Sequence, residues 1–184
     1  MSLDNYIFCL LGKSGSGKTT IAEKLFDKYG YTQIASYTTR PPRTNHDTDH
    51  VFVSQEEYDS LKNKVAFTRF NNYYYCATQE QVDKANLYVI DPFGLEQLKR
   101  LYAGKKKIIS IYVDVPMETC LDRMRRRGDN EDKIWERLRH DDDIFKGILG
   151  KCDYAINGIS ESSWHEVAAI IDIVASKMED FNND

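Results

Sequence analysis

Long apolar runs and a strong excess of charge of either sign are both missing from this sequence of 184 residues. No stretch approaches the ~20 consecutive apolar residues that a membrane-spanning helix needs. The net charge of −4 gives no overall basic field for nucleic acid or for a membrane surface. We therefore expect neither nucleic acid nor a membrane among the partners, and the sequence leaves the oligomeric state open.

Paired cysteines and a targeting signal are also missing. The four cysteines, Cys9, Cys76, Cys120 and Cys152, form no CxxC pair and show no His/Cys spacing typical of zinc. They are typical of buried or incidental thiols in a reducing compartment, with redox sensing as the weaker alternative. The first residues lack the charged and then apolar pattern of a signal peptide. These features predict a cytoplasmic protein.

Apolar runs alternate with helical patterns along most of the chain. Hydrophobic residues make up 41% and charged residues 29%, as in ordinary globular proteins. The alternation predicts an α/β fold in which a parallel sheet is flanked by helices. Residues 6–11 are a near-continuous apolar run, typical of a strand covered on both faces. We expect further strands over 31–36, 87–91, 108–115 and 155–156, and helices over 18–29, 92–101, 117–127, 134–145 and 162–177.

The pattern changes between about residues 36 and 86. Residues 39–49 are polar and loop-like, and Ser54 with Glu57 makes a capping box for a short helix. A pair of short strands and a helix that starts at Thr78 follow. We therefore expect one domain over 1–184, with a core of 4–35 and 87–184 and an insert of about 36–86 that contains its own small sheet.

A glycine-rich loop follows the first strand and opens the first helix. Its sequence, Gly12-Lys13-Ser14-Gly15-Ser16-Gly17-Lys18-Thr19, matches the pattern G-x-x-x-x-G-K-[ST]. The glycines let several backbone N–H groups point at one spot, where the helix N-terminus adds about half a positive charge. Lys18 reaches the β- and γ-phosphates, and the Thr19 hydroxyl is a Mg²⁺ ligand. The loop predicts a site for the phosphates of a nucleoside triphosphate.

Two groups of arginines indicate further phosphate contacts. Arg40 and Arg43 flank a Pro-Pro step that fixes part of the backbone, and arginine suits bidentate phosphate recognition. Arg123 and Arg127 share a helix face at i, i+4, next to Gly128. The alternative for the first pair is a solvated basic turn, and for the second a nucleic-acid patch or a solvated helix face.

The acidic run Asp141-Asp142-Asp143 lies close to the second group of arginines and is able to pair with it. Because consecutive helix positions diverge, we expect a solvated helix face here rather than a metal site. The histidines show no catalytic spacing, so no general base is predicted from them.

Together these motifs resemble the guanylate kinase family of nucleoside monophosphate kinases. The resemblance covers nearly the whole chain, in order. It implies a P-loop core with two mobile parts, an acceptor-binding insert over about 36–86 and a lid over about 124–137. The motifs that carry it are the GKSGSGKTT loop, S-x-T-T-R-P-P-R from Ser36 to Arg43, Phe52-Val53-Ser54, Asn72-Tyr73-Tyr74-Tyr75, Asp91-x-x-Gly94, Arg123-x-x-x-Arg127-Gly128 and Asp153-Tyr154-x-x-x-Asn157.

The resemblance also implies a role for each matched residue. The expected catalytic residues are Lys18, Arg40, Arg123, Arg127 and Arg137. ATP is expected to contact Gly12, Ser14, Gly15, Ser16, Gly17, Lys18, Thr19 and Thr20, with Asn157 near the adenine. The acceptor is expected to contact Ser36, Arg40, Arg43, His50, Arg69, Tyr75 and Asp91. Magnesium is expected at Thr19 and Asp91.

The positions that read the base depart from the family pattern. Arg69 stands where the family has a Glu that pairs with guanine, and Ala77 stands where it has a Ser or Thr. Val89 replaces the first of two acids, and His50 replaces a phosphate-binding Tyr. Because an arginine has only donors, Arg69 cannot replace a carboxylate opposite the N–H groups of guanine.

The leading hypothesis for function is ATP-dependent phosphoryl transfer to a nucleoside monophosphate, with GMP or dGMP as the acceptor. The acceptor is a phosphate oxygen with a second pKa of ~6, so the reaction needs positioning and charge rather than a general base. The departures support an alternative, a kinase of this fold that acts on another nucleotide or on a sugar phosphate. A binding module without activity is a third possibility, which Lys18 and the lid arginines oppose.

Overall fold

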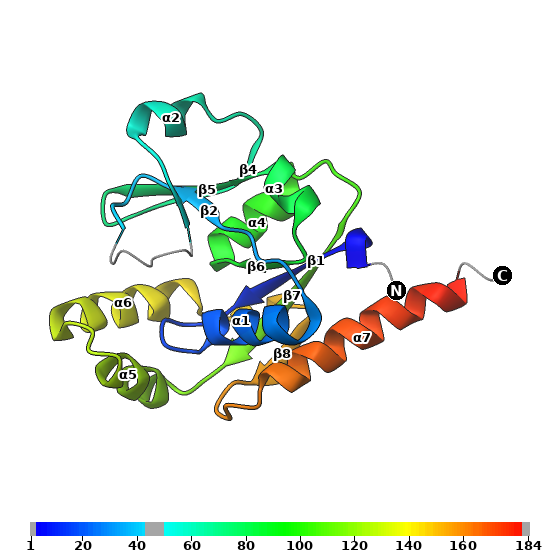
Figure 1. The fold of residues 1–184 in the computed structure, drawn as a ribbon. Coiled ribbons are helices and arrows are strands. Elements are labelled where there is room, and N and C mark those ends of the chain that lie inside the picture. Colours follow the sequence, from blue (N-terminus) through cyan, green and yellow to red (C-terminus); the bar gives the residue numbers. More distant parts are fainter. Residues whose placement is uncertain (1–2, 43–49, 182–184) are drawn as a thin grey trace.

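The computed structural model describes residues 3–42 and 50–181, and it confirms the α/β class. Four parallel strands form the core sheet in the order β6-β1-β7-β8, with helices packed on both faces (Figure 1). The core strands are β1 (Tyr6–Leu11), β6 (Leu87–Val89), β7 (Lys107–Asp114) and β8 (Tyr154–Asn157). The core helices are α1 (Lys18–Tyr29), α4 (Pro92–Leu101), α5 (Met117–Arg126), α6 (Glu131–Ile144) and α7 (Trp164–Phe181), with short 3-10 turns at Leu3–Asn5 and Ile148–Lys151.

Strand β1 is buried along its whole length, as its continuous apolar run predicts. Its alternate residues enter two separate cores. Phe8 and Leu10 pack with residues of α1 and α7, whereas Ile7 and Cys9 pack with residues of α4. Layers of helices on both faces hold β1 in place, and the glycine-rich loop begins where this strand ends.

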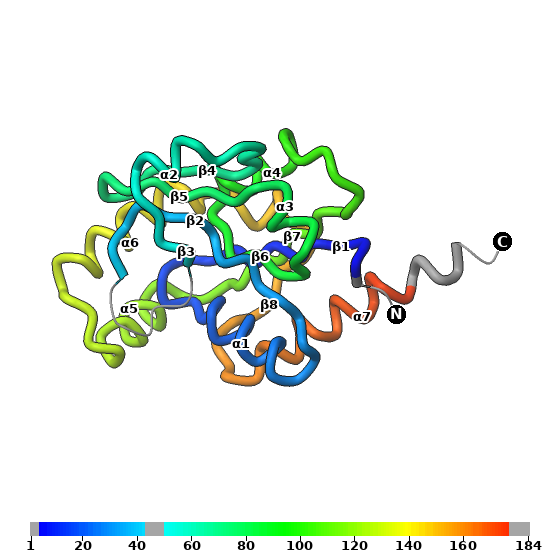
Figure 2. Tube along the Cα trace, turned by 45° about the horizontal axis from the view of Figure 1, so that its top comes forward, coloured from blue at the N-terminus to red at the C-terminus, as the bar shows by residue number. Residues whose placement is uncertain are grey.

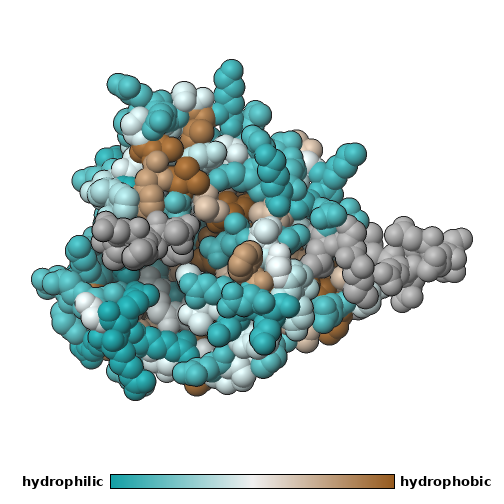
Figure 3. All heavy atoms as spheres, in the orientation of Figure 1, coloured by the Kyte–Doolittle hydropathy of each residue, from teal (hydrophilic) through white to brown (hydrophobic). Residues whose placement is uncertain are grey.

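A second sheet lies above the core sheet in Figure 1, with the strand order β3-β2-β5-β4. Strand β2 runs parallel to β3 and antiparallel to β5, which is antiparallel to β4. Val65, Ala66 and Ala77 of this sheet pack in the same core as Ile7, so shared apolar contacts join the two sheets. Hydrophobic residues on the face drawn in Figure 3 gather over this region. Its elements are β2 (Ser36–Thr38), β3 (His50–Phe52), α2 (Gln55–Ser60), β4 (Lys64–Phe70), β5 (Tyr73–Thr78) and α3 (Gln79–Lys84).

Helices α2 and α3 both begin with a capping box. The Ser54 hydroxyl accepts the Glu57 N–H at 3.1 Å, and the Glu57 carboxylate accepts the Ser54 N–H at 2.7 Å. Thr78 and Gln81 repeat this arrangement at α3. Each reciprocal pair satisfies backbone donors at the start of its helix, which explains why such short helices form here.

The predicted strand over residues 31–36 is wrong. Only Gln33 makes an isolated bridge, to Leu87, and the chain then leaves the core sheet to begin β2 at Ser36. All pairing partners of β2 belong to the second sheet, which is why the strand starts later than its apolar residues suggest. Strand β3 escapes prediction because three residues are too few to show an alternating pattern.

Helices α5 and α6 form a hairpin at one end of the molecule, beside the loop between β1 and α1 (Figures 1 and 2). Met124, Ile134 and Leu138 form a buried cluster of their own between the two helices. Helix α6 begins at Glu131 rather than near Ile134, because the Asn130 side chain caps it by accepting the Lys133 N–H at 3.2 Å. Within residues 3–42 and 50–181, no helix has the length and apolarity required to cross a membrane.

Candidate active site

The glycine-rich loop joins β1 to α1 and is shaped to bind an anion. Gly15 and Gly17 have φ of +79° and +92°, a left-handed conformation that side chains other than glycine rarely adopt. Gly17 is the N-cap of α1 and supplies no side-chain cap, so the first N–H groups of the helix face the loop without a side-chain acceptor. This is the arrangement that binds phosphate at a helix N-terminus.

Lys18, the first residue of α1, folds back over the loop. Its Nζ donates to the carbonyl oxygens of Gly12 at 2.6 Å and Lys13 at 2.9 Å. Burial lowers the pKa of the Lys18 ammonium to about 8, and the negative charge of Asp141 opposes this shift. The ammonium is therefore held within the curl of the loop, where the phosphates of a nucleotide would bind.

Gly15 gives a test of the loop geometry. A Cβ at this position would lie 2.5 Å from the Cys120 carbonyl oxygen, so Gly15→Ala must displace the loop. We expect this variant to bind ATP at least about tenfold more weakly, since strain of about 1–2 kcal/mol from the left-handed backbone adds to the clash. Titration with ATP, by calorimetry or a fluorescent analogue, measures the effect.

Gly30→Ala is the matched control. Gly30 has φ of +71° with nothing within 4 Å of a built Cβ, so its substitution adds the backbone strain without the clash. We expect a free energy of unfolding lower by about 1–2 kcal/mol and an unchanged affinity for ATP. Equal ATP affinities for the Gly15 and Gly30 variants would contradict the geometry described for the loop.

A cavity of about 510 Å³ opens on one side of the loop, which we call the donor-side cavity. Arg123 of α5 crosses it and donates to backbone carbonyl oxygens of the loop and of the turn after β8, including Ser16 at 3.2 Å and Gly158 at 3.0 Å. Arg123 thereby fastens α5 to the loop. Of the residues predicted from the sequence, Gly15, Ser16, Gly17, Thr20, Arg123 and Arg127 line this cavity.

A second cavity, of about 350 Å³, opens on the other side of the loop, between the core and the second sheet. We call it the acceptor-side cavity. It brings together residues from five parts of the chain that the sequence analysis proposed separately. The predicted residues that line it are Gly12, Ser14, Lys18, Thr19, His50, Tyr75, Asp91 and Arg137.

Polar side chains of the second sheet line a smaller hollow of about 120 Å³ that adjoins the acceptor-side cavity through shared residues. The Ser36 hydroxyl lies 3.0 Å from Nδ1 of His50, and the His50 ring packs edge-on against Tyr75 with centroids 5.5 Å apart. Thr68 lies beside them, because it is the register partner of Tyr75 in the β4–β5 pair. These groups form a polar wall opposite the glycine-rich loop.

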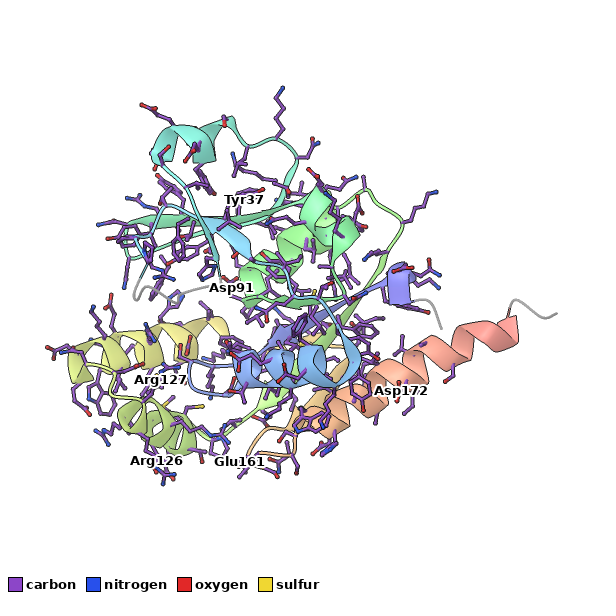
Figure 4. All side chains as sticks on the ribbon, in the orientation of Figure 1. Tyr37, Asp91, Arg126, Arg127, Glu161 and Asp172 are labelled. Carbon is purple, nitrogen blue, oxygen red and sulfur yellow. The ribbon has the colours of Figure 1, made fainter. Side chains whose placement is uncertain are left out.

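Asp91 follows strand β6 and is the N-cap of α4, where its carboxylate accepts the Gly94 N–H at 2.7 Å. Burial raises the pKa of the Asp91 carboxyl, and backbone hydrogen bonds from Gly94 and Phe93 oppose the rise. Figure 4 places Asp91 between the second sheet and the core helices. A partly buried carboxylate in this position favours a cation or an N–H donor nearby.

Among the predicted residues that the structure describes, three line neither of the two cavities nor the adjoining hollow. Arg69 points away from the acceptor side: it is exposed, and it bonds to the Asn72 side chain at 3.2 Å and lies over the Tyr74 ring. Arg40 is buried, with its guanidinium donating to the Pro41 carbonyl at 3.0 Å. The third is Asn157, which lines a separate hollow and accepts the Ile159 N–H. The prediction for Arg43 falls outside the described residues.

The expectation for the acidic run is wrong at Asp141. Asp142 and Asp143 are exposed, but Asp141 is only 6% exposed, and its carboxylate accepts the Ser14 N–H at 2.6 Å. Sequence reasoning also missed Thr68 and His140 as residues of the acceptor-side cavity. A signal for Asp141 was present, because it stands four residues after Arg137 and so shares its face of α6.

An inner strand of a parallel sheet, followed by a glycine-rich phosphate loop and a helix, defines a P-loop nucleotide-binding protein. In agreement, a family model described as an AAA domain matches residues 9–144. The chain resembles a guanylate kinase of Neisseria gonorrhoeae, with 30% identity over 143 residues that cover 72% of this chain and 70% of the relative. It belongs to the guanylate kinase family and is a nucleoside monophosphate kinase.

Two further comparisons extend the likeness over most of the chain. A guanylate kinase of Legionella pneumophila (strain Paris) is 28% identical over 180 residues, which cover 90% of this chain and 84% of the relative. The crystal structure of a guanylate kinase from Anaplasma phagocytophilum superposes with a TM-score of 0.68, 21% identity and coverage of 92% of this chain and 85% of that one. At 21% identity the structural match supports the fold alone.

Proposed function

We propose that this protein transfers the γ-phosphoryl group of ATP to GMP or dGMP, which yields ADP and the corresponding nucleoside diphosphate. The observation that carries the proposal is a single cavity that Lys18 of the loop, Arg137 of α6 and the polar side chains of the second sheet line together. Donor and acceptor phosphates can meet there with cationic groups on either side. Phosphoryl transfer needs this kind of positioning and charge stabilisation more than covalent chemistry.

The donor binds, in this proposal, along the glycine-rich loop and over the donor-side cavity. The loop N–H groups and Lys18 hold the β- and γ-phosphates, and Arg127 at the end of α5 lies close enough to line the same cavity. Arg127 pairs with Asp129, and Arg137 also reaches Asp129 at 3.4 Å. Arg127 at the end of α5 and Arg137 within α6 both belong to the proposed lid of about 124–137.

The acceptor binds between the second sheet and Asp91. Ser36, His50 and Tyr75 supply the polar groups for its phosphate, with Arg40 and Arg43 as the further contacts proposed from the sequence. The Thr68 hydroxyl is an acceptor that suits an N–H group of guanine, and the Asp91 carboxylate serves either the acceptor or the magnesium ion. Because Arg69 faces away from the hollow, its lack of acceptors does not count against guanine at this site.

Magnesium fits the donor set at the boundary between the two substrates. The Thr19 hydroxyl and the Asp91 carboxylate line the same cavity, and both are the hard oxygen donors that Mg²⁺ prefers. When bound, the ion neutralises charge on the phosphates. We place it there together with ATP, and we keep the cytoplasmic location and the mobile insert of about 36–86 as proposals from the sequence.

An acceptor panel tests this function. ADP formation from ATP is measured with GMP, dGMP, the other nucleoside monophosphates and several sugar phosphates at equal concentrations. We expect the highest kcat/KM with GMP or dGMP. Turnover with another acceptor and none with the guanine nucleotides would contradict the proposal.

A further inference from the structure

A buried carboxylate lies against the loop that is built to hold phosphate. Asp141 of α6 is 6% exposed, and its Oδ2 accepts the backbone N–H of Ser14 at 2.6 Å. The two residues that follow it, Asp142 and Asp143, are exposed to solvent. The contact is a tertiary one, since α6 and the loop are separated by more than a hundred residues of chain.

The N–H group that Asp141 uses belongs to the phosphate cradle. Backbone N–H groups of such a loop bind phosphate oxygens, and a carboxylate oxygen is an anionic acceptor of the same kind. A single N–H cannot make a full 2.6 Å hydrogen bond to both. The two acceptors therefore exclude each other at Ser14.

Ser14 occupies the end of the loop that faces the acceptor. It lines the acceptor-side cavity with Asp91, whereas Gly15, Ser16 and Gly17 line the donor-side cavity. A nucleotide laid along the loop from the donor side would bring its outermost phosphate to Ser14. The carboxylate of Asp141 is thus placed against the terminal phosphate rather than against the nucleoside.

We propose that Asp141 is an internal competitor of the terminal phosphate of ATP. The Asp141 carboxylate must leave the Ser14 N–H before the triphosphate is fully bound. The proposal rests on the nucleotide-binding role of the loop. Arg137 stands one turn earlier on the same helix and lines the same cavity. The His140 ring packs against Phe70 of the second sheet, with centroids 5.1 Å apart. A movement of α6 that withdraws Asp141 would therefore also displace Arg137 and His140 in the acceptor-side cavity.

The variant Asp141→Asn tests this competition, because it keeps the shape of the side chain and removes its charge. We expect it to bind ATP about tenfold more tightly than the unchanged protein, since a charged hydrogen bond and a repulsion are both weakened. The affinity for AMP should not change, because AMP lacks the terminal phosphates. The matched control is Asp142→Asn on the exposed face of the same helix, which should leave both affinities unchanged.

Several outcomes would overturn the proposal. One is an unchanged or weaker affinity for ATP in both Asp141→Asn and Asp141→Ala, with cooperative thermal unfolding showing that the variants are folded. Another is an equal gain for AMP and ATP, which would indicate a general loosening of the site. In the unsubstituted protein, the carbon-13 resonance of the Asp141 carboxyl should shift on addition of ATP and not of AMP; no shift with ATP would also overturn it.

These measurements separate the inference from the proposed function. They follow binding of adenine nucleotides alone, without an acceptor. A protein that gains ATP affinity in Asp141→Asn but shows no turnover with guanine nucleotides would contradict the proposed function and leave the competition intact.

Discussion

Lys18→Ala should reduce kcat/KM for phosphoryl transfer by about 10³-fold, a loss of roughly 4 kcal/mol of transition-state stabilisation. The reason is that the Lys18 ammonium lies inside the curl of the loop, bonded to the Gly12 and Lys13 carbonyls. From there it reaches the phosphates between which the bond breaks. Steady-state kinetics with ATP and GMP measure the loss.

Two further variants make this result interpretable. Lys28→Ala removes the same kind of side chain from an exposed position near the end of the same helix, and it should leave kcat/KM unchanged. Lys18→Met keeps most of the side-chain volume without the charge, and it should be nearly as inactive as Lys18→Ala. If either Lys18 variant retains its activity, the assignment of the loop as the donor site is wrong.

Arg137→Ala should lower kcat by about 10²- to 10³-fold while the KM for GMP changes little. Arg137 of α6 lines the cavity that Lys18, Thr19 and Asp91 share. A guanidinium there stabilises charge that develops on the transferred group, and it does so mainly in the transition state. The separate effects on kcat and KM distinguish this role from simple binding of the acceptor.

Arg139→Ala is the control for Arg137. Arg139 is exposed on the same helix and donates to the Trp135 carbonyl at 3.3 Å. We expect its loss to change neither constant. A kcat for Arg137→Ala within roughly threefold of that of Arg139→Ala would remove Arg137 from the catalytic residues.

The donor loop could be predicted from the sequence because the residues that form it follow one another along the chain. A strand, six loop residues and a helix follow one another, and the observed bounds of β1 and α1 are those that the apolar pattern predicts. The bounds of α4 were equally predictable, because Pro92 stands at its first position and Asp91 caps it.

The acceptor side depends on pairing between strands, and Arg69 is not among the residues that line the hollow there. Strand residues alternate between faces, so a shift of one residue moves Arg69 out of the hollow and Thr68 into it. The register is set by the turn at Asn71 and Asn72, which both have positive φ and so favour a tight hairpin. Once that turn is recognised, the antiparallel register of β4 and β5 places Thr68 opposite Tyr75.

The burial of Asp141 could not be predicted from the sequence for a different reason. The run of three acids was interpreted as one solvated face, although consecutive helix residues point in different directions. Its burial depends on where the hairpin of α5 and α6 docks against the loop, which no local pattern indicates. The spacing from Arg137 nevertheless marked Asp141 as the acid of the three that shares the face of a predicted site residue.

The most direct test of the central claim is to identify both products of one reaction. ATP and GMP are incubated with the protein and Mg²⁺, and the nucleotides are separated and quantified by chromatography. Our account predicts that ADP and GDP form in equal amounts, and that omission of GMP stops the formation of ADP. ADP that forms at the same rate without GMP, or without any GDP, would contradict it.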